Sequence, residues 1–181
     1  MLAIDDRDPV LNDRFKDAMS RLAASVCVAT VDNGIEGRAV TITSLISLSL
    51  EPPLVAFALS NKSRTRTLLR KGVPVGISVL RADQRDLAAR HAARDRRRGR
   101  LADAGHFQAW NGVWVVEGSN AWLASRMTGQ VSVGDHTLYV LEVDRAGSRR
   151  GTPLVYVDRG YGVACAGRDP VMAGGLDKQT F

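Results

Sequence analysis

Residues 38–53 read RAVTITSLISLSLEPP, and this stretch decides the fold. Hydroxyl side chains alternate with aliphatic ones, and successive side chains of an extended chain face opposite ways. One face of the predicted strand therefore carries Thr41, Thr43, Ser47 and Ser49. The other face points its aliphatic side chains into a core: Val40, Ile42, Ile46, Leu48 and Leu50. Two prolines end the run, so the apolar segment 54–59 that follows is predicted to be a separate buried strand.

Further strands are predicted on both sides of this stretch. Apolar runs rich in β-branched residues indicate them at 25–31, 75–80, 114–126, 137–145 and 154–157. Many short strands, mostly joined by hairpin-like turns, favour a closed or nearly closed antiparallel barrel. A doubly wound dinucleotide-binding sheet would need a GxGxxG turn between a strand and a helix, and the sequence has none.

Helices are predicted only at the periphery. Phe15, Met19 and Leu22 repeat at helical spacing, which predicts an amphipathic entry helix capped by Asn12 or Asp13. Shorter helices are predicted at 65–70 and at 83–94, the second capped by Asp83. The expected fold class is therefore mainly β with peripheral helices.

Length and composition predict one domain. The chain has 181 residues, of which 45% are hydrophobic, and this is enough for one substantial core. We expect a single domain over 1–181 with its core at about 12–163, and a tail at 164–181 that is flexible or packs on a partner subunit. The two cysteines, Cys27 and Cys165, are far apart and are expected to be reduced thiols, which favours a cytoplasmic protein without a metal site. The chain also begins without a signal-peptide pattern and has no apolar run long enough to span a membrane.

The net charge of +6 and a pI near 9.9 suit anionic ligands. Much of the excess comes from the arginines of residues 94–100. These arginines either form a solvated surface or attract the pyrophosphate of a dinucleotide. Nucleic acid is not expected as a partner, because no aromatic residues are interleaved with the arginines to stack on bases.

Residues 60–67 read SNKSRTRT and combine small hydroxyls with cations at the start of a predicted helix. Backbone N–H groups and cations in such a position can hold a phosphate. A polar helix cap with solvated cations would have the same composition, so the segment alone leaves both readings open.

These segments, together with GDHTLYVLEV at 134–143 and PLVYVDRGYG at 153–162, resemble the flavin reductase family of the FMN-binding split barrel. Members of this family supply reduced flavin to two-component monooxygenases. The resemblance covers about 15–161 and implies an antiparallel split β-barrel and a homodimer with flavin at the two-fold interface. It also implies an NAD(P)H:flavin oxidoreductase that uses FAD or FMN and prefers NADH over NADPH, with a monooxygenase as its partner. The alternative is a flavin-binding module that senses or stores flavin without turnover.

The resemblance also implies which residues bind the cofactors. The flavin ring would lie against Thr41, Thr43, Ser44, Ser47 and Ser49, and Arg38 would be a further cofactor-binding residue. The phosphate would bind to Asn61, Lys62, Ser63, Arg64 and Thr65. Gly134, Asp135 and His136 match a GDH motif near both nucleotides, and Arg159 and Tyr161 match a closing motif, although a plain β-turn explains that last pair equally well.

Hydride transfer needs positioning more than proton chemistry, because both electrons travel with the hydride. The sequence contains no convincing acid–base dyad or nucleophile arrangement, so His136 is expected to bind and orient rather than to act as an acid or base. Three positions depart from the family pattern. These are Leu141, where glycine is common, Ala124-Ser125, where a cysteine is frequent, and His91, which replaces an aromatic residue.

Overall fold

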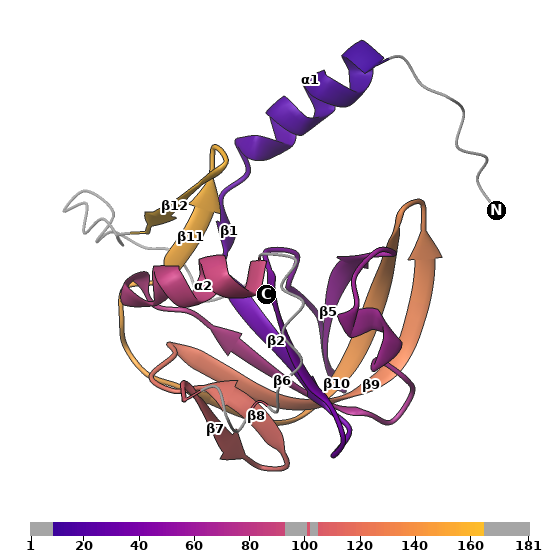
Figure 1. Ribbon diagram of the computed structural model, residues 1–181, viewed down its shortest axis with the longest axis vertical. Helices are drawn as coiled ribbons and strands as arrows, with labels where there is room; N and C mark the ends of the chain where they lie inside the picture. The colour runs from indigo at the N-terminus through magenta and orange to yellow at the C-terminus, as the bar shows by residue number, and fades with distance from the viewer. Residues whose placement is uncertain (1–8, 93–100, 102–104, 165–181) are drawn as a thin grey trace.

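The computed structural model describes residues 9–92, 101 and 105–164 (Figure 1). A seven-stranded antiparallel sheet dominates it, with strand order β3-β2-β6-β9-β10-β5-β4. Its strands are β2 (Cys27–Asp32), β3 (Gly37–Ile42), β4 (Ile46–Leu50), β5 (Pro53–Ser60), β6 (Pro74–Val79), β9 (Ala121–Val133) and β10 (His136–Ser148). The mainly β, antiparallel architecture is the one that the sequence predicts.

Two smaller sheets and four helices complete the described fold. One small sheet orders β1 (Ala24–Ser25), β11 (Leu154–Val157) and β12 (Gly160–Val163) as β1-β11-β12. The other is the hairpin of β7 (Phe107–Trp110) and β8 (Val113–Val116). The helices are α1 (Pro9–Ser20), α2 (Arg85–Ala92) and the short 3₁₀ helices η1 (Thr65–Thr67) and η2 (Ala82–Gln84).

The two edge strands of the large sheet are not paired with each other, and the break in the ladder between them is called here the seam. β3 and β4 are the edge strands, and residues 43–45 connect them directly. Within this link the Ser44 hydroxyl donates to the Ala58 carbonyl (3.1 Å) and accepts from the Ala58 N–H (3.0 Å). The Ser44 side chain therefore attaches the link between β3 and β4 to the backbone of β5, and the barrel stays split at the seam.

β2 is buried on both faces, and this explains its unbroken apolar sequence. Cys27, Ala29 and Val31 face one cluster, together with Phe57 and Ile77 inside the curled sheet. Val28 and Val26, just before the strand, face a second cluster under α2 and β8. Burial raises the pKa of the Cys27 thiol to about 12, in keeping with the prediction that Cys27 is an inert core residue.

α2 packs on the second core cluster, and polar contacts add to its attachment. The Thr41 hydroxyl of β3 donates to the Ala88 carbonyl of α2 at 2.8 Å. At the other end of α2, His91 Nε2 lies 2.9 Å from Nε2 of His106, next to β7. These rings also pack against Phe107. The helix thereby covers β3 and the second core cluster.

α1 stands away from the sheets (Figure 1). Its large apolar side chains are exposed, and Phe15 is 63% accessible. The helix begins at Pro9, so the predicted caps Asn12 and Asp13 lie inside it, and Leu22 lies after its end. Proline suits the first helical position because its missing N–H would have no intrahelical acceptor there.

Several predicted boundaries are wrong. The strand predicted over residues 38–53 breaks at 43–45, and Ile46, Leu48 and Leu50 are exposed instead of lying in the core. The strand predicted at 114–126 is two strands, because the chain turns at Gly118, whose φ is +74°.

The predicted helix at 65–70 is only the 3₁₀ turn η1, and the one at 83–94 is η2 followed by α2. Asp83 lies inside η2, where its carboxylate pairs with Arg81, and does not cap it. The arginines of residues 94–100, Cys165 and most of the tail lie outside the described residues.

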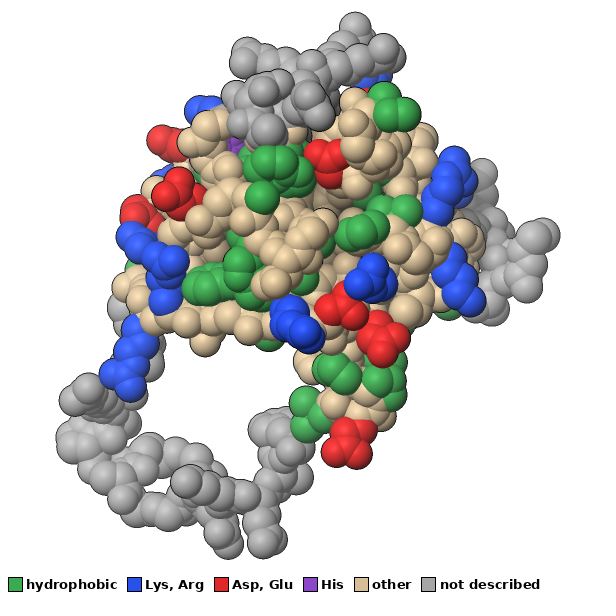
Figure 2. Space-filling view, turned by 90° about the horizontal axis from the view of Figure 1, so that it is seen from below, with side chains coloured by type: hydrophobic (Ala, Val, Ile, Leu, Met, Phe, Trp, Pro, Cys, Tyr) green, Lys and Arg blue, Asp and Glu red, His purple; other side chains and the backbone are tan. Residues whose placement is uncertain are grey.

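Figure 2 shows one face of the molecule, on which Lys and Arg side chains alternate with Asp and Glu around small apolar patches. Among the described residues of this face, charges of both signs are therefore interspersed. None of the helices within the described ranges combines the length and the apolar character needed to cross a bilayer.

Candidate functional site

The candidate site is built where β5 ends and β10 begins. These strands are antiparallel and pair Ser60 with His136, so the segments beyond this pair lie side by side. One segment is the loop of residues 60–66, called here the 60–66 loop. The other is the tight turn of residues 134–137, called here the 134–137 turn, in which Gly134 has φ +57°. The structure thus brings together two motifs that are far apart in the sequence.

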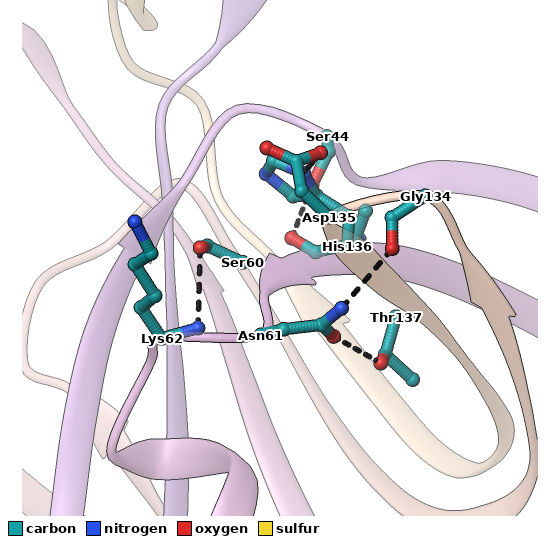
Figure 3. Close-up of polar contacts among 9 residues, drawn as sticks. Ser44, Ser60, Asn61, Lys62, Gly134, Asp135, His136 and Thr137 are labelled. Atoms are coloured by element: carbon teal, nitrogen blue, oxygen red, sulfur yellow. Dashed lines mark hydrogen bonds and ion pairs between the residues drawn. The ribbon is translucent and has the colours of Figure 1, made fainter. Parts of the chain in front are cut away.

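Asn61 joins these two segments (Figure 3). Its side-chain Nδ2 donates to the Gly134 carbonyl at 3.2 Å, and its Oδ1 accepts from the Thr137 hydroxyl at 2.7 Å. Its backbone N–H also donates to the Asp135 carbonyl at 2.8 Å. Both ends of the Asn61 amide therefore bond within the protein, and its role as a phosphate ligand stays a prediction.

The 60–66 loop itself carries cationic side chains. Lys62, Arg64 and Arg66 are exposed, and the Lys62 side chain extends away from the Asn61 amide (Figure 3). The loop is held in shape by Ser60, whose carbonyl accepts from the Ser63 N–H (2.8 Å) and whose hydroxyl accepts from the Lys62 N–H (3.3 Å). Such a loop presents positive charge from a fixed backbone, which suits a phosphate.

Of the other predicted phosphate ligands, Ser63 is half-buried and Thr65 is buried at the start of η1. The Arg66 guanidinium, which the sequence did not single out, donates to the Asn61 carbonyl at 3.3 Å and braces the loop. Lys62 and Arg64 are therefore the predicted ligands best exposed to an incoming anion.

His136 is oriented by its neighbour Asp135. His136 Nδ1 lies 2.7 Å from Asp135 Oδ1, so Nδ1 donates its hydrogen to the carboxylate. Nε2, on the other side of the ring, does not take part in this bond. The hydrogen bond and charge of His136, with a smaller contribution from Lys62, lower the pKa of Asp135 below its ordinary value. The carboxylate therefore stays ionised and keeps the ring in one orientation.

The residues predicted to contact the flavin ring do not share one face, because the chain leaves the sheet at 43–45. Arg38 pairs with Glu36, and Thr41 bonds to α2. Ser44 ties the seam, while Thr43 and Ser47 are exposed and Ser49 is half-buried. Ser44 bonds to Ala58 of β5, two residues before the 60–66 loop begins.

Arg159 and Tyr161 lie in another part of the chain. They belong to the turn before β12 and to β12 itself, which Figure 1 places far from the tip of the β9–β10 hairpin. Arg159 approaches Asp17 of α1 at 3.8 Å, and Tyr161 packs against Tyr156 with Arg85 over its ring. Within one chain, these two residues do not join the candidate site.

Like Arg66, Thr137 and Ser60 are residues of the site that were not among the predicted ligands. Thr137 is buried, and its hydroxyl donates to Asn61 Oδ1. Its position directly after the GDH motif is the one available signal. Among the described residues, no group of three or more His, Cys, Asp and Glu side chains is placed to hold a metal ion.

The model of the flavin reductase like domain matches residues 19–164 of the chain. The reductase component of 4-hydroxyphenylacetate 3-monooxygenase from Thermus thermophilus is 34% identical over 152 residues, which cover 83% of this chain and 95% of that protein. NADH:riboflavin 5'-phosphate oxidoreductase from Streptomyces pristinaespiralis is 34% identical over 171 residues, which cover 89% and 94%. Among solved structures, BorF, the flavin reductase component of a bacterial two-component tryptophan halogenase, aligns with a TM-score of 0.78 at 29% identity, covering 84% of this chain and 97% of BorF. The split-barrel prediction is thereby confirmed, and the chain belongs to the flavin reductase like domain family.

Proposed function

We propose that the protein is an NADH:flavin oxidoreductase that reduces FMN or FAD and passes the reduced flavin to a partner monooxygenase. The observation that carries the proposal is the joining of the cationic 60–66 loop to the turn with His136 at one end of the sheet. A phosphate site beside an oriented imidazole suits two nucleotides that must meet face to face. The named activities of the relatives, NADH-dependent reduction of FMN among them, support the same assignment.

The residues present fit a bound flavin and a nicotinamide nucleotide. Lys62 and Arg64 would hold the flavin phosphate, which FMN and FAD share, and His136 Nε2 would meet one of the two nucleotides. When bound, the nicotinamide supplies the hydride and the flavin ring accepts it. The chain's own task is then to bind and orient both groups and to exclude water between them.

We further propose that the working form is a homodimer. Large apolar side chains are exposed on three elements: Val10, Leu11, Phe15 and Met19 on α1, Ile46, Leu48 and Leu50 on β4, and Val131 and Val133 on β9. Exposed apolar groups of this extent are typical of an interaction surface. A second copy of the chain would cover them and would bring its own residues toward the flavin.

Steady-state oxidation of NADH at 340 nm with FMN, FAD or riboflavin, repeated with NADPH, tests the activity. We expect flavin-dependent turnover with NADH. Flavin binding without turnover by either nucleotide would instead indicate a non-catalytic flavin-binding protein, and the proposal would be wrong.

Riboflavin provides a matched control for the phosphate site because it lacks the phosphate. Lys62→Ala and Arg64→Ala each remove a charge-assisted bond of about 1.5–3 kcal/mol, so the KM for FMN should rise about 10- to 100-fold. The KM for riboflavin should stay within about twofold. Equal increases for both flavins would show that these cations do not bind the phosphate.

A further inference from the structure

Asn61 bonds to the 134–137 turn through both ends of its side-chain amide and through its backbone N–H. Its Nδ2 donates to the Gly134 carbonyl, its Oδ1 accepts from Thr137, and its backbone N–H donates to the Asp135 carbonyl. The Asn61 carbonyl in turn accepts from the Arg66 guanidinium at 3.3 Å. One residue of the cationic loop is thus bonded to three of the four residues of the turn that carries His136.

We infer that Asn61 is a positioning residue that makes the 60–66 loop and the 134–137 turn one mechanical unit, so that binding of the flavin phosphate sets the position of His136. This inference rests on the proposed function, because it assigns the phosphate to the loop and a nucleotide contact to His136. It goes beyond that function by coupling the two binding events. The amide of Asn61 serves this coupling and does not bind the phosphate itself.

The physical argument is the stiffness of the connection. Gly134 has a positive φ, and a glycine in a turn has many alternative conformations unless its carbonyl is fixed. Asn61 fixes that carbonyl and the next one, while buried Thr137 fixes Asn61 from below. His136 lies in the sequence between Asp135 and Thr137, which both bond to Asn61, and its Nδ1 is 2.7 Å from Asp135 Oδ1. A shift of the loop is therefore transmitted to the imidazole.

Thermodynamic linkage gives the coupling a direction that can be measured. If an occupied loop stabilises the turn, then bound FMN tightens the binding of the second nucleotide, and that nucleotide tightens FMN by the same factor. Lys62 lies on the same loop, but its backbone N–H bonds to Ser60, and its charge makes only a small contribution to the lowered pKa of Asp135 in the turn. Loss of Lys62 should weaken flavin binding alone, whereas loss of Asn61 should weaken both.

Thr137 provides the sharpest test, because it is only 1% accessible and cannot touch a ligand. Thr137→Val removes the hydroxyl that holds Asn61 Oδ1 and keeps the shape of the side chain. We expect Thr137→Val and Asn61→Ala each to raise the KM for NADH at saturating FMN by about 5- to 10-fold with little change in kcat, and Thr137→Ser to restore it. In a His136→Ala background, neither substitution should raise the KM for NADH further.

Two results would overturn the inference. The first is an increase in the KM for FMN alone. The second is an increase in the KM for NADH that persists in the His136→Ala background, since Asn61 would then act without His136.

Amide hydrogen exchange keeps the inference testable if the protein proves to have no NADH oxidation, which would refute only the proposed function. In the ligand-free protein, exchange at residues 134–136 should rise about 10-fold in Thr137→Val and return to the wild-type rate in Thr137→Ser. Unchanged exchange in Thr137→Val would show that the two segments are not one unit.

Discussion

The two regions on either side of β5 are completed in different ways. The 60–66 loop and the 134–137 turn satisfy each other through Asn61, so their shape is set within one chain. β4, on the other edge of β5, exposes Ile46, Leu48 and Leu50, with Leu50 73% accessible. The first region has its partners, while the second presents an apolar strand that one chain leaves uncovered. A polar site can therefore be preformed within one chain, while the apolar side chains of β4 beside it stay exposed unless a second surface covers them.

The largest effect is expected from breaking the uncovered region. Leu48→Asp would place a carboxylate in the proposed interface twice, once from each copy, and an unpaired buried carboxylate is strongly unfavourable. We expect the dimer dissociation constant to rise at least 100-fold, measured by light scattering or sedimentation equilibrium. Ile35→Asp is the matched control, because Ile35 is 88% exposed at a hairpin outside this surface. If Leu48→Asp remains as dimeric as Ile35→Asp, β4 does not form the interface.

The second largest effect is expected at Ser44, which attaches the link between β3 and β4 to β5. Ser44→Ala removes both the bond to the Ala58 N–H and the one to the Ala58 carbonyl. We expect the free energy of unfolding to fall by about 1–2 kcal/mol in urea titrations, because a backbone N–H and a carbonyl lose their partner. Ser47→Ala, on the exposed side of β4, should change it by less than about 0.5 kcal/mol. Equal effects would mean that the bonds of Ser44 to β5 do not stabilise the fold.

A smaller effect is expected from the carboxylate of the completed region. The pKa of Asp135 is lowered in the folded protein, chiefly by His136, so ionised Asp135 stabilises the fold at pH values above its unfolded pKa. This contribution is lost as the pH falls through the lowered folded value. The melting temperature of wild type should therefore exceed that of Asp135→Asn at neutral pH, and the two should converge in the acid range. A constant difference at every pH would contradict the ion pair with His136.

The smallest effect is expected for the reactivity of Cys27, a thiol in the core inside the large sheet. With a pKa near 12, Cys27 is a neutral thiol at pH 8 and should not react with Ellman's reagent in the native protein. The Cys165→Ser variant isolates this thiol. It should react fully in urea and negligibly without it, and rapid native reaction would show that the barrel opens at the seam.

The sequence predicts the buried strands better than the exposed ones. β2, β5, β6 and β10 lie where apolar runs predict strands, because burial on one or both faces leaves a clear signature. The run at 38–53 misleads, since alternation shows that one face is apolar but not whether the same chain buries it. The turn at Gly118 carries the glycine signal that separates β8 from β9.

The candidate site was predictable as a set of motifs, but not as a set of contacts. The loop and the GDH motif were both recognisable, whereas the role of Asn61 depends on Gly134, 73 residues away, and on a buried threonine. No local pattern reports which strand ends will meet. The opposite case is given by Arg159 and Tyr161. The resemblance assigns them to the candidate site, but within one chain they lie apart from it.

The meeting of His91 and His106 provides a spectroscopic tool. Two imidazole nitrogens 2.9 Å apart share one hydrogen, so one Nε2 donates and the other accepts, and the two rings are magnetically distinct. The chain has only three histidines, and the third is His136. An imidazole nitrogen spectrum of the whole protein therefore contains a pair of signals that reports on the attachment of α2 and a single residue that reports on the 134–137 turn, with nothing else to overlap them.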